Sequence, residues 1–437
     1  MIERNKYLNQ LIKTKENGFP KVITGIRRCG KSFLLKTIYK NYLINECKIA
    51  ESNILIIELD DDRNINLRNP INLGIYVREY CRNKTTCYVF LDEIQKIQQI
   101  INPAFTNGHI ILAKDDDPNK VSFVDVVLGL SREPNIDLYI TGSNSKMLSS
   151  DIITEFRDKA TNIHLSPVSF EEYVNYKKGY APELLNDYIF YGGMPLVVLA
   201  NSEEDKKFYL KNLYKTTYFK DILERNRIYK SEALDELCDI ISDSVGNLIN
   251  AEKISNTYKS KKKETIDKET VTKLINYFVD AFIIREAKRY DVKGRREIGA
   301  LRKYYFSDLG LRNARINFSH PDTGYMLENV IYNELLYHGF TVNVGTYELV
   351  EKNKNNKSVK NTYEIDFLAT KNNNTFYVQV ADNISNAKAL LREKRPYSHL
   401  KDPIQKVLVV NQPLKQTRDA EGYILIGATE FLLDFLK

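Results

Sequence analysis

Two short segments of the sequence combine residue types that bind phosphate and Mg²⁺. In VITGIRRCGKS, residues 22–32, Gly25 is followed after four residues by Gly30, Lys31 and Ser32. This is the spacing of a phosphate-binding loop: its backbone N–H groups surround phosphate oxygens, the lysine contacts the terminal phosphates, and the hydroxyl binds Mg²⁺. A strand-like apolar run precedes the loop and a helix-periodic run follows it, so the helix N-terminus adds positive partial charge. We therefore expect a nucleoside triphosphate to bind here.

The residues expected to contact the nucleotide belong to this loop and to the start of the helix. They are Gly25, Arg28, Cys29, Gly30, Lys31, Ser32 and Phe33. The alternative interpretation is a Gly-rich turn between a strand and a helix that a Lys-Ser pair follows by chance. Average residue frequencies make such a match rare, roughly one in tens of thousands of positions, so the pattern favours nucleotide binding.

The second segment is YVFLDE, residues 88–93, in which an apolar run ends in Asp92 and Glu93. Carboxylates at the C-terminal end of a buried strand have the Walker B arrangement. Asp92 is expected to hold Mg²⁺ through its water shell, and Glu93 to activate the attacking water. Many strands end in an acidic residue, so this pattern alone is weak. It indicates a Walker B segment because a phosphate-binding loop precedes it in the sequence.

Two further residues are candidates for roles in phosphoryl transfer. The run DLYIT, residues 137–141, predicts another buried strand, and a polar residue just after it, such as Asn144, can orient water or sense the terminal phosphate. Arg157 can act as an arginine finger that stabilises charge on the transferring phosphoryl group. A surface arginine without a catalytic role explains Arg157 equally well.

The composition bounds the class of protein. A chain of 437 residues predicts two to four domains, and 43% apolar with 28% charged residues is typical of a globular protein. No apolar run is long enough to span a membrane, and the N-terminal residues do not form a signal peptide. Five scattered cysteines without zinc spacing suit a reducing compartment. We therefore expect a cytoplasmic protein, and its net charge of +7 slightly favours polyanionic partners.

The order of the motifs resembles one family. GIRRCGKS, FLDEIQK, ITGSNSKMLSSDI, LSPVSFEEYV and YGGMPLVV follow one another between residues 25 and 198. The chain is therefore similar to the AAA+-type P-loop ATPases of bacteria and archaea whose second half carries a domain of unknown function with a restriction-nuclease-like fold. The resemblance implies an α/β P-loop NTPase core with a five-stranded parallel sheet, in which Lys31, Ser32, Asp92, Glu93 and Asn144 have the functions given above. In that family the segment around Arg157 usually carries more than one basic residue, and here Lys159 can share its place.

Four domains are expected along the chain: an AAA+-like ATPase core at 1–166, a helical lid at 167–230, a winged helix–turn–helix at 231–316 and a nuclease-like α/β domain at 317–437. Apolar residues at three- and four-residue spacing predict the helices of the lid. Two helices followed by a basic hairpin predict the winged helix. Residues 251–320 hold 17 Lys and Arg against 9 Asp and Glu. This surplus indicates DNA binding, but a solvated basic surface or a protein-binding module fits it as well.

The last domain has the layout of PD-(D/E)xK nucleases. Glu328 is expected on a helix and Asp366 on a strand, where such carboxylates hold divalent ions. Gln379 and Ala381 stand where the third strand should carry an acid and a lysine. We therefore expect the fold without the cleavage chemistry, unless a neighbouring acid such as Glu364 or Asp382 fills the vacancy.

Together these patterns predict an ATP-binding protein with Mg²⁺ as cofactor, which hydrolyses ATP slowly and acts as a nucleotide-dependent switch. DNA is the first candidate partner, and a protein partner or a second copy of the chain are others. Two alternatives remain open: an ATP-dependent nuclease of a defence system, and a non-hydrolysing ATP-binding signalling scaffold. No association with a membrane is expected.

Overall fold

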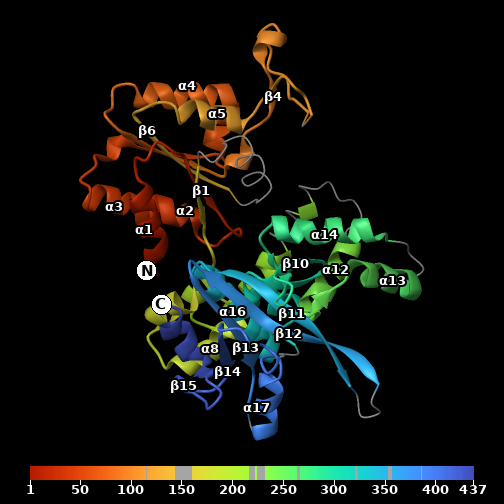
Figure 1. The fold of residues 1–437 in the computed structure, drawn as a ribbon. Helices are drawn as coiled ribbons and strands as arrows, with labels where there is room; N and C mark the ends of the chain where they lie inside the picture. The colour runs from red at the N-terminus through yellow and green to blue at the C-terminus, as the bar shows by residue number, and fades with distance from the viewer. Residues whose placement is uncertain are drawn as a thin grey trace. The chain divides into compact units, whose positions relative to one another are not determined.

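The computed structural model describes residues 1–114, 116–142, 160–215, 222–223, 232–262, 266–319, 323–352, 357–384 and 386–437. These residues form two compact units (Figure 1). The N-terminal unit consists of residues 3–167 and 280–282, and the C-terminal unit of residues 1–2, 168–279 and 283–437. Within the described part of the chain, no helix is both long and apolar enough to cross a membrane.

The N-terminal unit is built on a parallel sheet of five strands in the order β2-β3-β6-β1-β7. The strands are β1 (Lys21–Thr24), β2 (Ile54–Glu58), β3 (Cys87–Asp92), β6 (Ile136–Thr141) and β7 (Thr161–His164). Every residue of β3 and β6 is buried, as the near-continuous apolar runs of the sequence predicted for a parallel sheet covered on both faces. The predicted α/β core with a five-stranded parallel sheet is confirmed.

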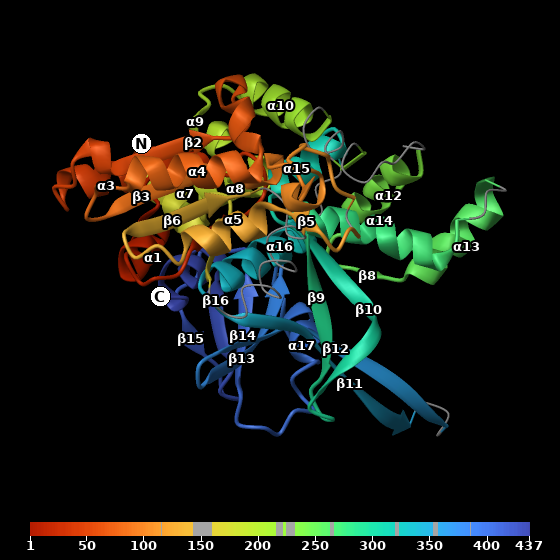
Figure 2. The ribbon, with the colours of Figure 1, turned by 90° about the horizontal axis from the view of Figure 1, so that it is seen from above.

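Helices cover this sheet, and two of them, α4 and α5, begin with side-chain caps. They are α1 (Asn5–Thr14), the continuous helix α2–η1–α3 (Lys31–Phe33, Leu34–Tyr39, Lys40–Asn45), α4 (Pro70–Cys81) and α5 (Phe123–Leu130). Helices α4 and α5 lie side by side (Figures 1 and 2), and their apolar residues share one core with β2, β3 and β6. Ser122 and Asp125 form a capping box at the start of α5, which stabilises that helix end.

The polar composition of residues 102–125 predicts an insertion or a long surface excursion between core strands. In the structure, residues 102–114 and 116–122 form an arm with little regular structure. Strands β4 (Ile100–Ile101) and β5 (Lys120–Val121) pair antiparallel at its base, and the arm stands clear of the sheet of its own unit (Figure 1). The arm exposes Phe105, Ile110 and Leu112.

The C-terminal unit begins with helices, as predicted for the segment after residue 167. These are α7 (Phe170–Lys177), α8 (Ala181–Tyr191), α9 (Pro195–Leu199) and α10 (Glu203–Asn212). Gly192 and Gly193 separate α8 from α9, and both glycines lie against the carboxylate of Asp308. Gly193 N–H donates to Asp308 Oδ2 at 2.7 Å, and a Cβ on Gly192 would lie 2.3 Å from Asp308 Oδ1.

A second group of helices and a large sheet complete the C-terminal unit. The helices are α12 (Glu232–Asp243), α13 (Ala251–Lys262), α14 (Lys268–Asp280), α15 (Leu309–Arg315), α16 (Thr323–Tyr337), α17 (Ala387–Lys394), α18 (Ala428–Glu430) and η8 (Phe431–Phe435). The strands are β8 (Leu248–Ile249), β9 (Ile284–Asp291), β10 (Arg296–Phe306), β11 (Thr341–Lys352), β12 (Ser358–Lys371), β13 (Asn374–Ala381), β14 (Gln405–Val410), β15 (Thr417–Arg418) and β16 (Ile424–Gly427).

These strands form one sheet in the order β15-β16-β14-β13-β12-β11-β9-β10-β8. The hairpin β9–β10 joins the strands that follow it because β9 pairs parallel with β11, with Gly345 opposite Tyr290. The sequence placed a domain boundary at 316. In the structure, the strands on both sides of that residue share a sheet and a compact unit.

Two segments differ from what the sequence predicted. Residues 251–262 form α13, although their sequence is part of a Lys-rich stretch that predicts no helix of its own. The Lys- and Asn-rich composition of residues 351–361 predicts a loop, but β11 continues to Lys352 and β12 begins at Ser358, so the antiparallel pairing of a long hairpin extends into this segment (Figure 2). Neither segment has enough apolar residues for a periodic pattern.

Candidate nucleotide-binding site

The loop between β1 and α2 has the backbone conformation that a phosphate-binding loop needs. Gly25, Arg28 and Gly30 all have positive φ, at 144°, 67° and 102°. Gly25 is required for space as well, because a Cβ there would lie 2.2 Å from the carbonyl oxygen of Leu165. Glycine is the residue that adopts such angles and close approaches without strain, which explains its spacing in this loop.

Lys31 lies inside the loop. Its side chain is buried, and Nζ donates hydrogen bonds to the carbonyl oxygens of Gly25 at 3.0 Å and Ile26 at 3.1 Å. The ammonium is thus held at the mouth of the loop by neutral carbonyls, and no carboxylate of the described residues forms an ion pair with it. Such an arrangement leaves the positive charge available for an anion.

The carboxylate of Asp92 joins the loop to the ends of two neighbouring strands. Ser32 Oγ donates to Asp92 Oδ1 at 2.9 Å, and the hydroxyl of Thr141, at the end of β6, donates to the same oxygen. Lys36 Nζ lies 3.4 Å from Asp92 Oδ2 and pairs with Glu58 as well. Ser32 and Asp92 therefore meet as the two segments predicted, and their oxygens are the kind of ligand that Mg²⁺ prefers.

Glu93 follows in a left-handed conformation, with φ of 57° and ψ of 52°. Its backbone N–H donates to Thr141 Oγ1 at 3.1 Å, and its carboxylate accepts a hydrogen bond from Gln95. Non-glycine residues at positive φ are uncommon and cluster at functional sites. The conformation turns the backbone sharply just after the buried strand, so that Glu93 is half-buried at the sheet edge beside Asp92.

The remaining residues predicted for the loop differ in exposure. Arg28 and Phe33 are exposed, whereas Cys29 is buried and its Sγ donates to the carbonyl of Leu165 at 3.4 Å. The Cys29 side chain therefore packs against the end of β7. Asn144 and Arg157, as well as Lys159, lie outside the described residues.

Sequence reasoning missed Thr141 and Lys36 as neighbours of Asp92. Thr141 is the last residue of a strand that was predicted, so its position at the sheet edge beside β3 could have been inferred from the parallel order. Lys36 offered no signal of this kind, because a lysine on the exposed side of a helix is common.

The residues predicted for the nuclease-like site also come together, within the C-terminal unit. Glu328 on α16 and Asp366 on β12 are both buried, and Asp366 Oδ2 accepts a hydrogen bond from Val380 N–H at 2.8 Å. Gln379 is on β13, where Ala381 ends the strand. Among the residues that the structure describes, no group of three or more His, Cys, Asp or Glu is placed to hold a metal ion.

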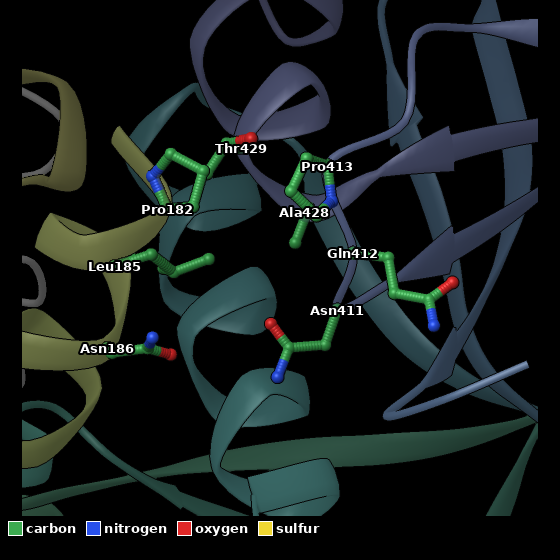
Figure 3. A pocket seen from close by; sticks show the side chains of 8 residues that line it. All are labelled: Pro182, Leu185, Asn186, Asn411, Gln412, Pro413, Ala428 and Thr429. Atoms are coloured by element: carbon green, nitrogen blue, oxygen red, sulfur yellow. The ribbon is translucent and has the colours of Figure 1, made fainter. Parts of the chain in front are cut away.

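A separate pocket of about 230 Å³ lies in the C-terminal unit, between α8 and the residues that follow β14 and β16 (Figure 3). Its lining consists of Pro182, Leu185, Asn186, Asn411, Gln412, Pro413, Ala428 and Thr429. None of these described side chains is charged, and Asn411 and Gln412 already donate to Asp382 and Asn383. This composition suits neither a phosphate group nor a metal ion.

The fold and the loop define the N-terminal unit as an AAA+-type P-loop domain, a class of domain that binds ATP with Mg²⁺. Residues 17–174 match the family model described as an AAA domain, and residues 182–322 match a domain of unknown function, DUF8612.

The family relationship extends over the whole chain. The chain belongs to the same family as an uncharacterised protein of Haemophilus influenzae, with which it is 30% identical over 442 residues that cover 99% of both chains. An uncharacterised protein of Methanocaldococcus jannaschii is 28% identical over 360 residues, 80% of this chain and 71% of that protein.

Among solved structures, the Walker-type ATPase of Pyrococcus abyssi is similar at 14% identity and a TM-score of 0.47, over 72% of this chain and 96% of that one. Cdc6p of Pyrobaculum aerophilum is similar at 13% identity and a TM-score of 0.30, over 76% and 94%.

Proposed function

We propose that the protein is a slow ATPase that acts as a nucleotide-dependent switch. The observation that carries this proposal is the group formed by Ser32, Asp92 and Thr141 beside the buried Lys31. It puts a hydroxyl, a carboxylate and an ammonium at the mouth of a loop whose glycines adopt positive φ. These are the groups that bind a triphosphate and its cation.

Each of these side chains has a distinct task in the proposed reaction. Lys31 exchanges its contacts with loop carbonyls for contacts with the terminal phosphates of ATP. Ser32 and Asp92 would hold Mg²⁺, which when bound neutralises charge on the phosphate oxygens. Glu93 accepts a proton from the attacking water, and Thr141 keeps the backbone of Glu93 and the carboxylate of Asp92 in register.

Two residues beyond the described part of the chain belong to the same proposal. Asn144 orients the water or contacts the terminal phosphate, and Arg157 or its neighbour Lys159 stabilises charge in the transition state. A surface position without catalytic function stays the alternative for Arg157.

Phosphate release from ATP tests the proposal. Glu93→Gln keeps the shape of the side chain but cannot accept the proton, so turnover should fall by about a hundredfold or more while ATP remains bound. Glu79→Gln, an exposed change on α4, is the matched control and should turn over at the wild-type rate. Wild-type turnover in Glu93→Gln would show that Glu93 is not the base. Tight ATP binding without turnover in the wild type would favour the signalling scaffold.

We propose further that residues 167–230 act as a lid and that residues 231–316 form a winged helix. The order α12, β8, α13, α14, β9, β10 supports the winged helix, because β8 pairs with β10 and the β9–β10 hairpin takes the place of the wing. In that arrangement α14 is the recognition helix. Thr272, Lys273 and Asn276 lie on its exposed face, and side chains of these types donate hydrogen bonds to phosphates or bases.

DNA is the partner that this surface suits best. At the turn of the hairpin, Asp291 accepts from the backbone N–H groups of Lys293 and Gly294 at 3.1 and 2.9 Å, which fixes the turn. Lys293, Arg295 and Arg296 are exposed around it. A protein partner or a second copy of the chain is the alternative occupant of this surface.

The five cysteines form no disulfide bond, which fits the cytoplasmic location predicted from the sequence.

The C-terminal domain is proposed to keep a nuclease-like fold without cleaving nucleic acid. Gln379 can offer only a neutral oxygen to a metal ion, and Ala381 cannot stabilise charge on a phosphate. Incubation of the protein with linear, nicked and single-stranded DNA and with RNA, in Mg²⁺ and Mn²⁺ and with or without ATP, should leave the substrates intact. Cleavage that disappears in Asp366→Ala would support the nuclease of a defence system instead.

A further inference from the structure

The two buried carboxylates of the nuclease-like layout face a lysine from another part of the chain. Lys303 is on β10, and its Nζ lies 3.0 Å from Glu328 Oε1 and 2.8 Å from Glu364 Oε1. The hydroxyl of Tyr305 donates to the same oxygen of Glu328 at 2.5 Å. An ammonium group thus links carboxylates that come from α16 and β12.

The ammonium of Lys303 is buried together with two of the carboxyl groups around it. Lys303 is 3% exposed, Glu328 5% and Asp366 8%. Burial by itself lowers the pKa of Lys303, but the negative charges of Glu328, Asp366 and Glu364 outweigh that effect and hold the pKa above its ordinary value. A buried carboxylate without a nearby cation would be strongly destabilising, so Lys303 supplies the positive charge that this group of acids needs.

An irregularity in the β9–β10 hairpin determines where Lys303 points. Ile298 is opposite Arg289, whereas Lys303 is opposite Ala287, so β10 advances five residues while β9 advances two. Because side chains alternate between the faces of a strand, an odd difference turns the following residues to the other face. The small side chain of Ala287, which is fully buried, leaves room for the long side chain opposite it.

In the nuclease-like layout, strand β13 should supply the third metal ligand. In the β12–β13 pairing, Phe367 is opposite Val378, so the next pair along is Asp366 and Gln379, whose side chains share a face. Gln379 Oε1 is buried and makes no hydrogen bond within the described residues. A neutral oxygen therefore stands where a third negative ligand would have to be.

We propose that the ammonium of Lys303 takes the place of a divalent metal ion in this cluster, so that the cluster is held together by an internal cation and binds no Mg²⁺ or Mn²⁺. The inference rests on the nuclease-like layout proposed above and gives the loss of cleavage a cause beyond Gln379 and Ala381. The ammonium meets its carboxylates at 2.8 and 3.0 Å, and its three N–H donors can serve several carboxylate oxygens at once. A divalent ion in the same space would lie against a like charge.

Removal of the ammonium should turn the cluster into a metal site. Mn²⁺ binding is measured without nucleotide, by electron paramagnetic resonance of free Mn²⁺ and by the shift in melting temperature. Wild-type protein and Lys211→Ala, a change of an exposed lysine on α10, should show no Mn²⁺ binding that depends on Asp366. Lys303→Ala should gain such binding, with an affinity at least tenfold above any residual Mn²⁺ binding of the wild type, and the double variant Lys303→Ala/Asp366→Asn should lose it.

The outcomes are distinct even if the variant folds poorly. If Lys303→Ala is unfolded without metal, refolding that requires Mn²⁺ and fails in the double variant supports the proposal. A folded Lys303→Ala that binds no Mn²⁺, or an unfolded one that Mn²⁺ does not rescue, overturns it. Mn²⁺ bound by the wild type and lost in Asp366→Asn overturns it as well. ATP turnover is a separate readout, so failure of the proposed ATPase function would not be mistaken for any of these results.

Discussion

At the scale of single residues, the proposed chemistry depends most on Lys31, whose buried ammonium is held by the carbonyl oxygens of Gly25 and Ile26. Gly25, Gly30, Lys31 and Ser32 were predictable because a strand, a tight loop and a helix fix their relative positions. Asp92 was predictable for a similar reason, as the last residue of a buried strand. Lys303 was not, because its place beside Glu328 depends on a register shift that no local pattern signals.

Lys31→Ala tests the loop directly. The change removes the ammonium that is held at the mouth of the loop, so affinity for ATP with Mg²⁺ should fall by at least about tenfold, or 1.4 kcal/mol. Isothermal titration calorimetry measures it. Lys40→Ala is the matched control, since Lys40 lies further along the same helix and pairs with Glu51 on the surface. Equal affinities in the wild type and in Lys31→Ala would place the nucleotide elsewhere.

At the scale of elements, strands and helices with strong apolar patterns were predictable, and elements defined by long-range contacts were not. Strands β1, β3 and β6 of the N-terminal unit lie where apolar runs predicted them. Apolar runs at 405–410 and 423–426 also predict strands, and they form β14 and most of β16. Helix α13 and the ends of β11 and β12 are polar, and tertiary pairing rather than composition defines them. The turn between α8 and α9 also depends on a residue far away in the sequence, Asp308.

The burial of Asp308 makes the stability of the C-terminal unit depend on pH. Burial raises the pKa of this carboxyl to about 6, although backbone N–H groups such as that of Gly193 oppose the rise. The unfolded chain releases the same proton near pH 4. The contribution of Asp308 to stability is therefore full below about pH 4 and is lost as the pH rises through 6.

Urea unfolding of the wild type and of Asp308→Asn, at several pH values, measures this effect. Asparagine does not titrate, and the other titrating groups are the same in both proteins. The difference between their free energies of unfolding therefore reports the titration of Asp308 alone. The stability of the wild type relative to Asp308→Asn should fall by about 1–2 kcal/mol between pH 5 and 7.5. A difference that does not change with pH would mean that Asp308 titrates at its ordinary pKa in the folded protein.

The hairpin β9–β10 is the element on which DNA binding can be tested. Replacing Arg295 and Arg296 by Glu should weaken binding to all DNA sequences alike and flatten its dependence on salt, because fewer counterions are released. The matched control is Lys415→Glu with Arg418→Glu, an equal change of charge near β15, at the opposite edge of the same sheet. Fluorescence anisotropy at several salt concentrations gives both quantities. Equal losses in the two pairs would indicate a general charge effect rather than a specific surface.

At the scale of the whole molecule, the sequence predicted four domains, whereas the structure divides into two compact units. The expected boundary near residue 167 coincides with the end of the main segment of the N-terminal unit. Residues 280–282 are an exception that sequence patterns could not reveal. They comprise the last residue of α14 and the two residues after it, yet they belong to the N-terminal unit.

This short segment contacts the strand next to the nucleotide loop. The ring of Phe282 lies 5.0 Å from that of His164 on β7, and His164 Nδ1 is 3.2 Å from the hydroxyl of Thr24, the residue before Gly25. Phe282 also has a positive φ of 57°, a conformation that costs energy for a bulky residue and persists only where its surroundings impose it. Phe282 is thus linked through His164 to Thr24, the residue that precedes the nucleotide loop.

If the protein is a switch that binds DNA, its affinity for DNA should differ between the ATP-bound and ADP-bound states, and Phe282 should carry part of that difference. In Glu93→Gln, which keeps ATP bound, DNA affinity should stay at its ATP value. A coupling free energy of the usual 1–3 kcal/mol gives a ratio of about 5- to 150-fold between the two affinities. Phe282→Ala should bring this ratio closer to one, while ATP affinity remains unchanged. Phe208→Ala, a change of an exposed ring on α10, is the control and should keep the wild-type ratio. A Phe282→Ala protein that binds ATP normally and responds to it as the wild type does would rule out this connection as the route between the two sites.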